Sequence, residues 1–106
     1  MIRGGPMIYV DKLFEWPAFG YRWWFHMTTN QDDLTELHAM ARAIGIAQRH
    51  FQNKPFFPHY DGTGRTKEMA EIRRQHAISL GAVETTTVEL AKMTYQRRKA
   101  AQKQRE

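Results

Sequence analysis

The sequence predicts a single small α/β domain in which a short mixed sheet of about three strands is covered by three principal helices. The chain has 106 residues, of which 42% are hydrophobic and 25% charged, values typical of one globular domain. Short apolar or alternating runs indicate strands, and longer segments with apolar residues three and four positions apart indicate helices. These elements follow one another in the order strand, strand, helix, helix, strand, helix.

Three segments have the pattern of strands, at residues 7–10, 21–28 and 82–85. The first is a short apolar run that ends at Asp11, which is typical of a mostly buried strand. The second alternates: its core face carries Tyr21, Trp23, Phe25 and Met27, and its polar face carries Arg22, Trp24, His26 and Thr28. The third can run parallel to the second, because helices connect them.

Three segments have helical periodicity, at residues 32–44, 66–80 and 87–100. Asn30 or Asp32 can cap the first helix, and Gly45 fits the left-handed position that closes its end in a Schellman motif. Thr66 can cap the second helix, and the segment Thr86-Thr87-Val88-Glu89 matches a capping box before the third.

The segments rich in glycine and proline are predicted as loops. These are residues 15–20 and residues 47–61, where a short turn around Arg49-His50-Phe51 is followed by an aromatic, proline-bearing loop at residues 55–61. Gly62-Thr63-Gly64 then breaks the chain, so that exposed amides and the cation of Arg65 can meet a phosphate at the helix N-terminus. The alternative is that the polar residues of this segment only cap the helix.

The net charge of +5 comes from the C-terminal segment. Residues 1–91 carry ten Lys or Arg and ten Asp or Glu, whereas residues 92–106 carry six basic residues and one acidic residue. We therefore divide the chain into a neutral α/β domain, 1–91, and a basic helix end or tail, 92–106. The tail can contact nucleic-acid phosphates through Arg97, Arg98, Lys99 and Lys103, or it can serve only to keep the protein soluble.

The composition excludes several classes of protein. Cysteine is absent, which removes disulfide scaffolds, thiol nucleophiles, zinc ribbons and iron–sulfur clusters and favours the cytoplasm of the cell. Residues 1–10 lack a long apolar run, so we expect neither a signal peptide nor a membrane partner. Ser79 is the only serine and lies inside a predicted helix, which argues against a serine hydrolase.

Five short segments carry a resemblance to a known family. They are Ile8-Tyr9-Val10-Asp11, Arg22-Trp23-Trp24-Phe25-His26-Met27, Glu36-Leu37-His38-Ala39-Met40-Ala41, Pro58-His59-Tyr60-Asp61 and Leu80-Gly81-Ala82-Val83. With them the chain resembles the family called domain of unknown function 4031, over most of residues 7–90. That family comprises small proteins of bacteria and tailed bacteriophages, so the resemblance implies a phage or prophage accessory protein, and it supplies no catalytic residue.

The candidate site combines side chains from the polar strand face, a helix edge and the aromatic loop. We predict that one concavity is lined by His26, His38, His59, Tyr60 and Asp61. Arg22, Arg49 or Arg65 would supply positive charge, and Trp24 or Tyr60 would cover a base. Two alternatives stay open: the histidines only satisfy core hydrogen bonds, or they bind a metal, although no HxxxH or HxH pair occurs and we assign no metal ligand.

The leading functional hypothesis is a non-enzymatic protein that binds an anionic ligand, with a nucleotide as the first candidate, or a host protein, as counter-defence proteins do. The alternatives are a metal-assisted phosphoesterase or nuclease that uses Asp11, Asp61 and the histidines, and a nucleic-acid binder that uses the basic tail. No cofactor is predicted. Short strands and surplus aromatic residues leave an edge or patch to cover, which favours a homodimer.

Overall fold

The structure is a computed structural model that describes residues 7–105. Its elements are β1 (Ile8–Val10), β2 (Phe14–Ala18), β3 (Tyr21–Thr29), α1 (Thr35–Ala43), a 3₁₀ turn η1 (Gln48–His50), β4 (Phe51–Lys54), β5 (Phe57–Gly64), α2 (Lys67–Ser79), β6 (Val83–Glu84) and α3 (Thr87–Arg105). The α/β class and the three helices are confirmed, but the sheet has six strands instead of about three. Within residues 7–105, no helix combines the length and the apolar character needed to cross a membrane.

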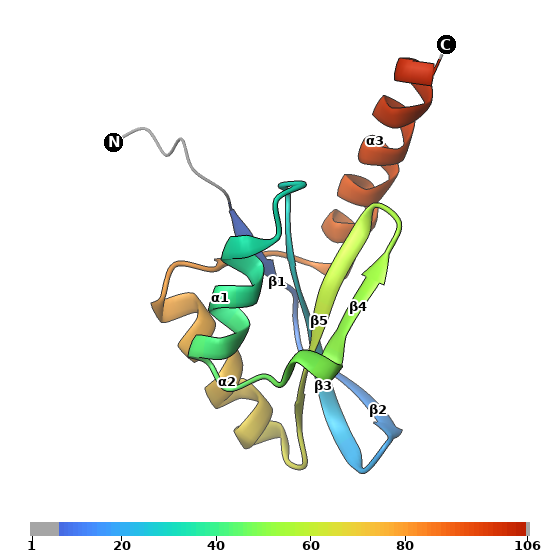
Figure 1. Cartoon of the computed structure of the whole chain (residues 1–106). Helices are drawn as coiled ribbons and strands as arrows, with labels where there is room; N and C mark the ends of the chain where they lie inside the picture. Colours follow the sequence, from blue (N-terminus) through green and yellow to red (C-terminus); the bar gives the residue numbers. More distant parts are fainter. Residues whose placement is uncertain (1–6, 106) are drawn as a thin grey trace.

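The sheet has the strand order β4-β5-β3-β1-β6, and β2 pairs with β3 outside this path. Only β1 and β6 are parallel to each other, and the other described pairs are antiparallel. Because β1 is antiparallel to β3, β6 is antiparallel to β3 as well, so the expected parallel relation between the second and third predicted strands is wrong. Helices α1 and α2 lie together on one side of the sheet, whereas α3 projects away from the domain (Figure 1).

Three strands occupy segments that were predicted as loops. β2 contains Pro17, which an edge strand tolerates because its missing N–H is not needed on the open side. Its register with β3 shifts between Glu15 and Ala18, as at a β-bulge. β4 and β5 form an antiparallel hairpin, and β5 also pairs with β3 over six residue pairs from Trp23↔Gly64 to Thr28↔His59. Most of the aromatic, proline-bearing segment is therefore part of an inner strand of the sheet.

The glycines of β5 permit close packing and do not form a phosphate-binding loop. A Cβ at Gly62 would overlap the ring of Phe25, and a Cβ at Gly64 would overlap the backbone of Ala70 in α2. Phe25 is fully buried. The predicted break at Gly62-Thr63-Gly64 is corrected for this reason: the absence of side chains lets the core and α2 approach the strand directly.

The predicted ends of the helices are largely confirmed. Gly45 has φ of 81°, and the N–H groups of Ile46 and Gly45 donate to the carbonyls of Ala41 and Arg42 over 2.8 and 3.2 Å, as in a Schellman motif. Thr66 caps α2 by accepting a hydrogen bond from the backbone of Met69 over 3.1 Å.

The predicted N-terminal cap of α1 is wrong, whereas the predicted capping box of α3 is confirmed. α1 begins at Thr35, and neither Asn30 nor Asp32 caps it; instead Asp33 accepts hydrogen bonds from the backbone N–H and the hydroxyl of Thr35 over 3.0 and 2.7 Å. Thr86 accepts from the backbone of Glu89 over 3.1 Å, as the capping box predicts. α3 then continues to Arg105, five residues beyond the predicted end.

One buried cation joins α2 to two strands. The side chain of Arg74 is 4% exposed; its Nε donates to the backbone oxygen of Asp11 over 2.7 Å, and its two terminal nitrogens donate to Glu71 and Glu84. These contacts fix the position of Asp11, whose side chain reaches the opposite side of the sheet from α2.

We expect Gly62→Ala to destabilise the protein by about 1–3 kcal/mol, because the new methyl group overpacks the core. The double variant Gly62→Ala/Phe25→Leu should lose about 1 kcal/mol less stability than the two single variants lose together, because the leucine removes the clashing ring. Urea unfolding of the four chains measures both effects. A Gly62→Ala variant as stable as the parent would contradict this account of the glycine.

The pair formed by Arg74 and Glu84 predicts a dependence of stability on pH. The hydrogen bond from Arg74 and the charges of Arg74 and Lys12 hold the pKa of Glu84 below its usual value. A carboxyl whose pKa is lower in the folded state stabilises the protein above the unfolded pKa, and this contribution is lost as the pH falls through the folded value. Urea unfolding should therefore show that the stability difference between the parent and Glu84→Gln shrinks from pH 7 to pH 3. A difference that stays constant would contradict a stabilising role of the Glu84 carboxylate.

Candidate functional site

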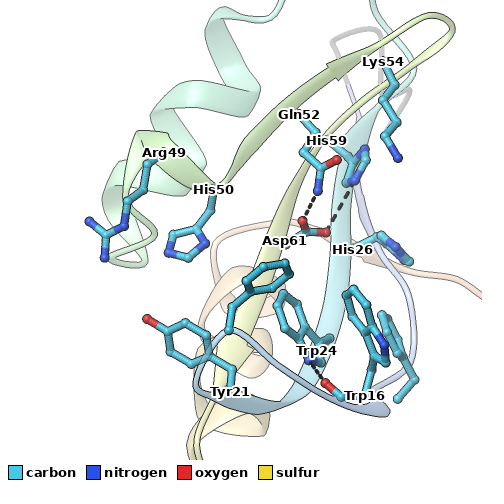
Figure 2. A pocket seen from close by; sticks show the side chains of 12 residues that line it. Trp16, Tyr21, Trp24, His26, Arg49, His50, Gln52, Lys54, His59 and Asp61 are labelled. Atoms are coloured by element: carbon cyan, nitrogen blue, oxygen red, sulfur yellow. Dashed lines mark hydrogen bonds and ion pairs between the residues drawn. The ribbon is translucent and has the colours of Figure 1, made fainter.

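The sheet face turned away from α1 and α2 forms a cleft of about 640 Å³ between the β2–β3 hairpin and the η1–β4 segment (Figure 2). Its lining is mainly aromatic on one side and polar or basic on the other. The lining residues are Phe14, Trp16, Phe19, Tyr21, Trp24, His26, Arg49, His50, Gln52, Lys54, His59 and Asp61. Side-chain alternation explains the floor of the cleft, because residues 24 and 26 of β3 and residues 59 and 61 of β5 point to the same side.

The aromatic wall is a packed group of rings carried by β2 and β3. The rings of Trp16 and Trp24 have centroids 5.2 Å apart, and the indole N–H of Trp24 donates to the backbone oxygen of Trp16. Tyr21 packs edge-on against Trp24 at 6.1 Å. Trp24 is buried, whereas Trp16 and Phe19 are 52% and 83% exposed. Trp16 and Phe19 therefore offer an accessible apolar surface, and the buried, hydrogen-bonded indole of Trp24 packs against Trp16.

The floor of the cleft is polar and centred on Asp61. This carboxylate accepts a hydrogen bond from Gln52, and its Oδ1 lies 3.4 Å from Nε2 of His59. Burial raises the pKa of Asp61, but hydrogen bonds with His59 and Gln52 and the charges of His59 and His26 outweigh burial and hold the pKa below its usual value.

A fully buried carboxylate orients His26 beside this floor. One oxygen of Asp11 accepts from the backbone N–H of His26 over 2.6 Å, and the other accepts from Nδ1 of His26 over 2.7 Å. The second oxygen also accepts from the hydroxyl of Thr87, the first residue of α3, over 3.0 Å. The ring of His26 is further held by stacking on Phe14 at 5.2 Å.

Positive charge enters the cleft from the η1–β4 side. Arg49 and Lys54 are exposed, and His50 is half-buried between Arg49 and Tyr21. Burial and the neighbouring charge of Arg49 lower the pKa of His50, which favours its neutral form at neutral pH. The fixed charges on this side are therefore those of Arg49 and Lys54.

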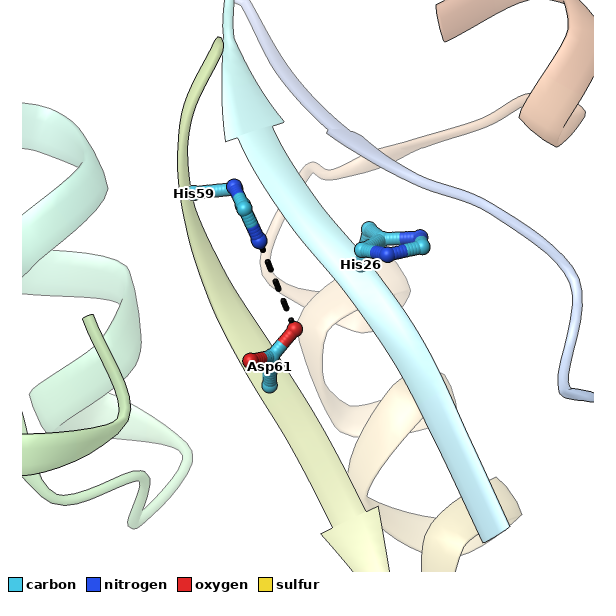
Figure 3. Close-up of side chains that lie close together, drawn as sticks. All are labelled: His26, His59 and Asp61. Atoms are coloured by element: carbon cyan, nitrogen blue, oxygen red, sulfur yellow. Dashed lines mark ion pairs between the residues drawn. The ribbon is translucent and has the colours of Figure 1, made fainter. Parts of the chain in front are cut away.

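Three of the floor residues have the donor types of a metal site. One ring nitrogen each of His26 and His59 and one carboxylate oxygen of Asp61 all lie within 4.8 Å of one another (Figure 3). Sequence analysis left metal binding by the histidines as an alternative without assigned ligands, because only the pairing of β3 with β5 brings residue 26 opposite residue 61.

Comparison with protein families decides where the chain belongs. A family profile described as "Protein of unknown function (DUF4031)" matches residues 8–97. The chain belongs to the DUF4031 family. The matched segment contains the whole sheet, α1, α2 and the first half of α3, and thus every residue that lines the cleft. No match was found among curated proteins or among solved structures.

This DUF4031 protein divides the predicted site residues between the two faces of its sheet. Trp24, His26, Arg49, His59 and Asp61 line the cleft. His38 and Tyr60 lie on the helix-covered face, where Nδ1 of His38 and the hydroxyl of Tyr60 are 2.7 Å apart. Tyr60 is 2% exposed and belongs to the core, and burial raises its pKa. The expectation of one shared concavity is therefore wrong for His38 and Tyr60, because neighbouring residues of a strand point to opposite faces.

The other basic candidates of this DUF4031 protein lie outside the cleft. Arg22 is paired with Glu15 on the neighbouring strand, and Arg65 is exposed between β5 and α2. In α3, Arg97 donates to the carbonyl of Thr29 over 3.3 Å and pairs with Asp32 over 2.9 Å, so it fastens the helix to the end of β3.

The other three basic candidates of α3 make no contact with the sheet like that of Arg97 among the described residues. Arg98 and Lys99 flank the ring of Tyr95 at 6.0 and 5.7 Å, and Lys103 is exposed. These three residues, unlike Arg97, present their charges on the outside of the helix.

Sequence reasoning missed about half of the cleft lining. It did not include Phe14, Trp16, Phe19, Tyr21, His50, Gln52 and Lys54 among the site residues. Trp16 and Phe19 lie in the segment predicted as a loop, and His50, Gln52 and Lys54 lie in the segment predicted as a turn and loop, whereas Tyr21 was expected on the core face of a strand. The alternation in Phe51-Gln52-Asn53-Lys54 was the available signal, since Gln52 and Lys54 share a face only if this segment is a strand.

We predict that Tyr60→Phe lowers the stability of the protein by about 1 kcal/mol, because it leaves the ring nitrogen of His38 without its partner. Chemical denaturation measures this loss. A variant that unfolds at the same denaturant concentration as the parent would show that the pair is not structural.

Proposed function

We propose that this protein binds a small anionic ligand that contains a planar ring, with a nucleotide as the first candidate. The observation that carries the proposal is that one cleft of about 640 Å³ has an exposed aromatic surface on one side and two cationic side chains on the other. Pockets of this volume suit small molecules, and apolar walls with a few polar groups are typical of them.

The aromatic side suits a base. Trp16 is accessible, and Trp24 supports it from behind at 5.2 Å. A base that stacks on an indole gains about 1–3 kcal/mol. Trp24 is held by its hydrogen bond to the β2 backbone, so the indole against which Trp16 packs is already ordered before a ligand binds.

The charges suggest how the ligand is oriented. Arg49 and Lys54 attract phosphate oxygens, and a guanidinium can bind them through two parallel hydrogen bonds. Asp61 repels the same oxygens and can accept hydrogen bonds from hydroxyl groups. The phosphate is therefore proposed to lie against the η1–β4 side and the sugar hydroxyls over the floor.

The wider role rests on the resemblance noted above and is a proposal as well. A phage or prophage accessory protein that captures a nucleotide of its host would need to bind the nucleotide but not to convert it. The other partner that we propose is a host protein. Binding of nucleic acid through Arg98, Lys99 and Lys103 is the second candidate, favoured by the projection of α3 away from the domain (Figure 1). Homodimer formation and the cytoplasmic location stay predictions.

Thermal-shift measurements against nucleoside mono-, di- and triphosphates test the proposal. We expect stabilisation by at least one nucleotide, and we expect Arg49→Ala to weaken its binding by about 10–100-fold, which corresponds to the loss of hydrogen bonds from a charged group. Trp16→Ala should weaken binding by a similar factor through lost stacking.

The matched control is Arg42→Ala, because Arg42 is also an exposed arginine but belongs to α1 on the other side of the sheet. It should bind as the parent does. The proposal fails if no nucleotide stabilises the protein, or if Arg49→Ala and Arg42→Ala have the same effect.

A further inference from the structure

The floor of the cleft carries three groups that the sheet brings together from two strands. His26 lies directly opposite Asp61 in the pairing of β3 with β5, and His59 precedes Asp61 by two residues on the same face of β5. Figure 3 shows the side chains of all three grouped over the two strands, and the distances between their donor atoms are at most 4.8 Å. Strand register therefore assembles a set of two imidazoles and one carboxylate.

The hydrogen bonds of the two histidines determine which ring nitrogens carry lone pairs. Nδ1 of His26 donates to the carboxylate of Asp11 over 2.7 Å, and Nδ1 of His59 donates to the backbone oxygen of Phe57 over 2.9 Å. Carboxylate and carbonyl oxygens accept hydrogen bonds, so both Nδ1 atoms carry protons. In each neutral ring Nε2 then keeps its lone pair for another partner.

The distance between His59 and Asp61 suits two ligands of one ion. Nε2 of His59 and Oδ1 of Asp61 are 3.4 Å apart. A protonated His59 donates to the carboxylate of Asp61, whereas in the neutral ring with a proton on Nδ1 both facing atoms are acceptors. A proton shared in a charge-assisted hydrogen bond normally holds such atoms at about 2.7–2.9 Å. Two ligands bound to a tetrahedral zinc ion at about 2.0–2.2 Å are about 3.3–3.6 Å apart. The spacing of this one pair agrees with the second arrangement, and the ring nitrogen of His26 lies within 4.8 Å of both atoms.

Each of the three groups is also oriented by a partner behind it. Asp11 holds His26 and is itself fixed by a backbone N–H and by Thr87. The carbonyl of Phe57 holds His59, and Gln52 holds the other oxygen of Asp61. Carboxylate and carbonyl partners of this kind are typical of histidines that bind metals, since they fix the tautomer and the direction of the ring.

We propose that His26, His59 and Asp61 bind one divalent transition-metal ion of the zinc and cobalt class at the floor of the cleft. Imidazole nitrogens favour such ions over Mg²⁺ and Ca²⁺, which prefer sites made of oxygen atoms. The side chains of His26 and Asp61 are 23% and 15% exposed, so an ion can enter from the cleft, and its remaining coordination positions face the space above the floor. This inference does not depend on nucleotide binding, because all three proposed ligands come from the protein itself.

Titration of the full chain, prepared without a histidine tag, with Co²⁺ tests the proposal directly. We expect the visible absorption of protein-bound Co²⁺ to saturate at one equivalent, and we expect Zn²⁺ to displace it. An excess of Mg²⁺ should leave the absorption unchanged.

Variants identify the ligands. His26→Gln and Asp61→Asn, each checked for its fold by circular dichroism, should lower the affinity for Co²⁺ by at least about 100-fold, since losing a direct ligand costs more than the 10–100-fold typical of an outer partner. Asp61→Asn keeps the size of the side chain and serves as the test if His26→Gln does not fold. His76→Ala is the control, because His76 is exposed on α2, on the other side of the sheet.

Two results would overturn the proposal. The first is the lack of saturable Co²⁺ absorption in the parent protein, which would mean that the pair of His59 and Asp61 holds only a proton. The second is Co²⁺ binding that survives in a folded His26→Gln or Asp61→Asn variant, or that falls equally in His76→Ala.

Discussion

The antiparallel pairing of β3 with β5 is the constraint on which the rest of the structure depends. It places Phe25 over Gly62 on the helix-covered face and His26 beside Asp61 on the cleft face. A shift of one residue in this register would exchange the two faces, because side chains alternate with a period of two. The tight contact between Phe25 and Gly62 opposes such a shift. Core packing on one side of the sheet thereby sets the geometry of the polar floor on the other.

Asp11 connects this packing to the cleft. Its backbone oxygen receives the buried guanidinium of Arg74 from α2, and its side chain holds the ring of His26. Through Thr87 the same carboxylate also contacts the start of α3. A buried carboxylate is costly unless hydrogen bonds satisfy it, and here three donors do so. The residue therefore has a structural reason to be aspartate, and this reason also fixes the direction of a cleft histidine.

Much of the fold could be predicted because it is encoded locally. Gly45, Thr66 and Thr86 act at helix ends through contacts with residues at most five positions away, and spacing reveals such contacts. The β4–β5 hairpin could not be predicted in this way. Its second strand has Pro58 as its second residue and Gly62 and Gly64 among its last three, and Phe25 and α2 fill the space beside those glycines. Local propensity gives the wrong answer where distant residues supply the stabilising contacts.

The site was predictable in its residue types and only partly in its grouping. His26, His59 and Asp61 were selected correctly as neighbours, but His38 and Tyr60 were placed with them, although the strand parity of residues 59 to 61 assigns Tyr60 to the core. That parity is informative only once the segment is known to be a strand. The aromatic wall was missed for the same reason, since Trp16 belongs to a strand that contains a proline.

The projection of α3 has an electrical consequence. A helix of 19 residues extends about 28 Å at 1.5 Å per residue, and its basic second half carries the net charge of the chain, whereas residues 1–91 are neutral. The molecule is thus a permanent dipole with its positive end away from the cleft-bearing domain (Figure 1). The electric field of a polyanion orients the protein so that the C-terminal end of α3 points toward the polyanion. This interaction acts over about 8 Å at physiological ionic strength and several times farther in dilute buffer.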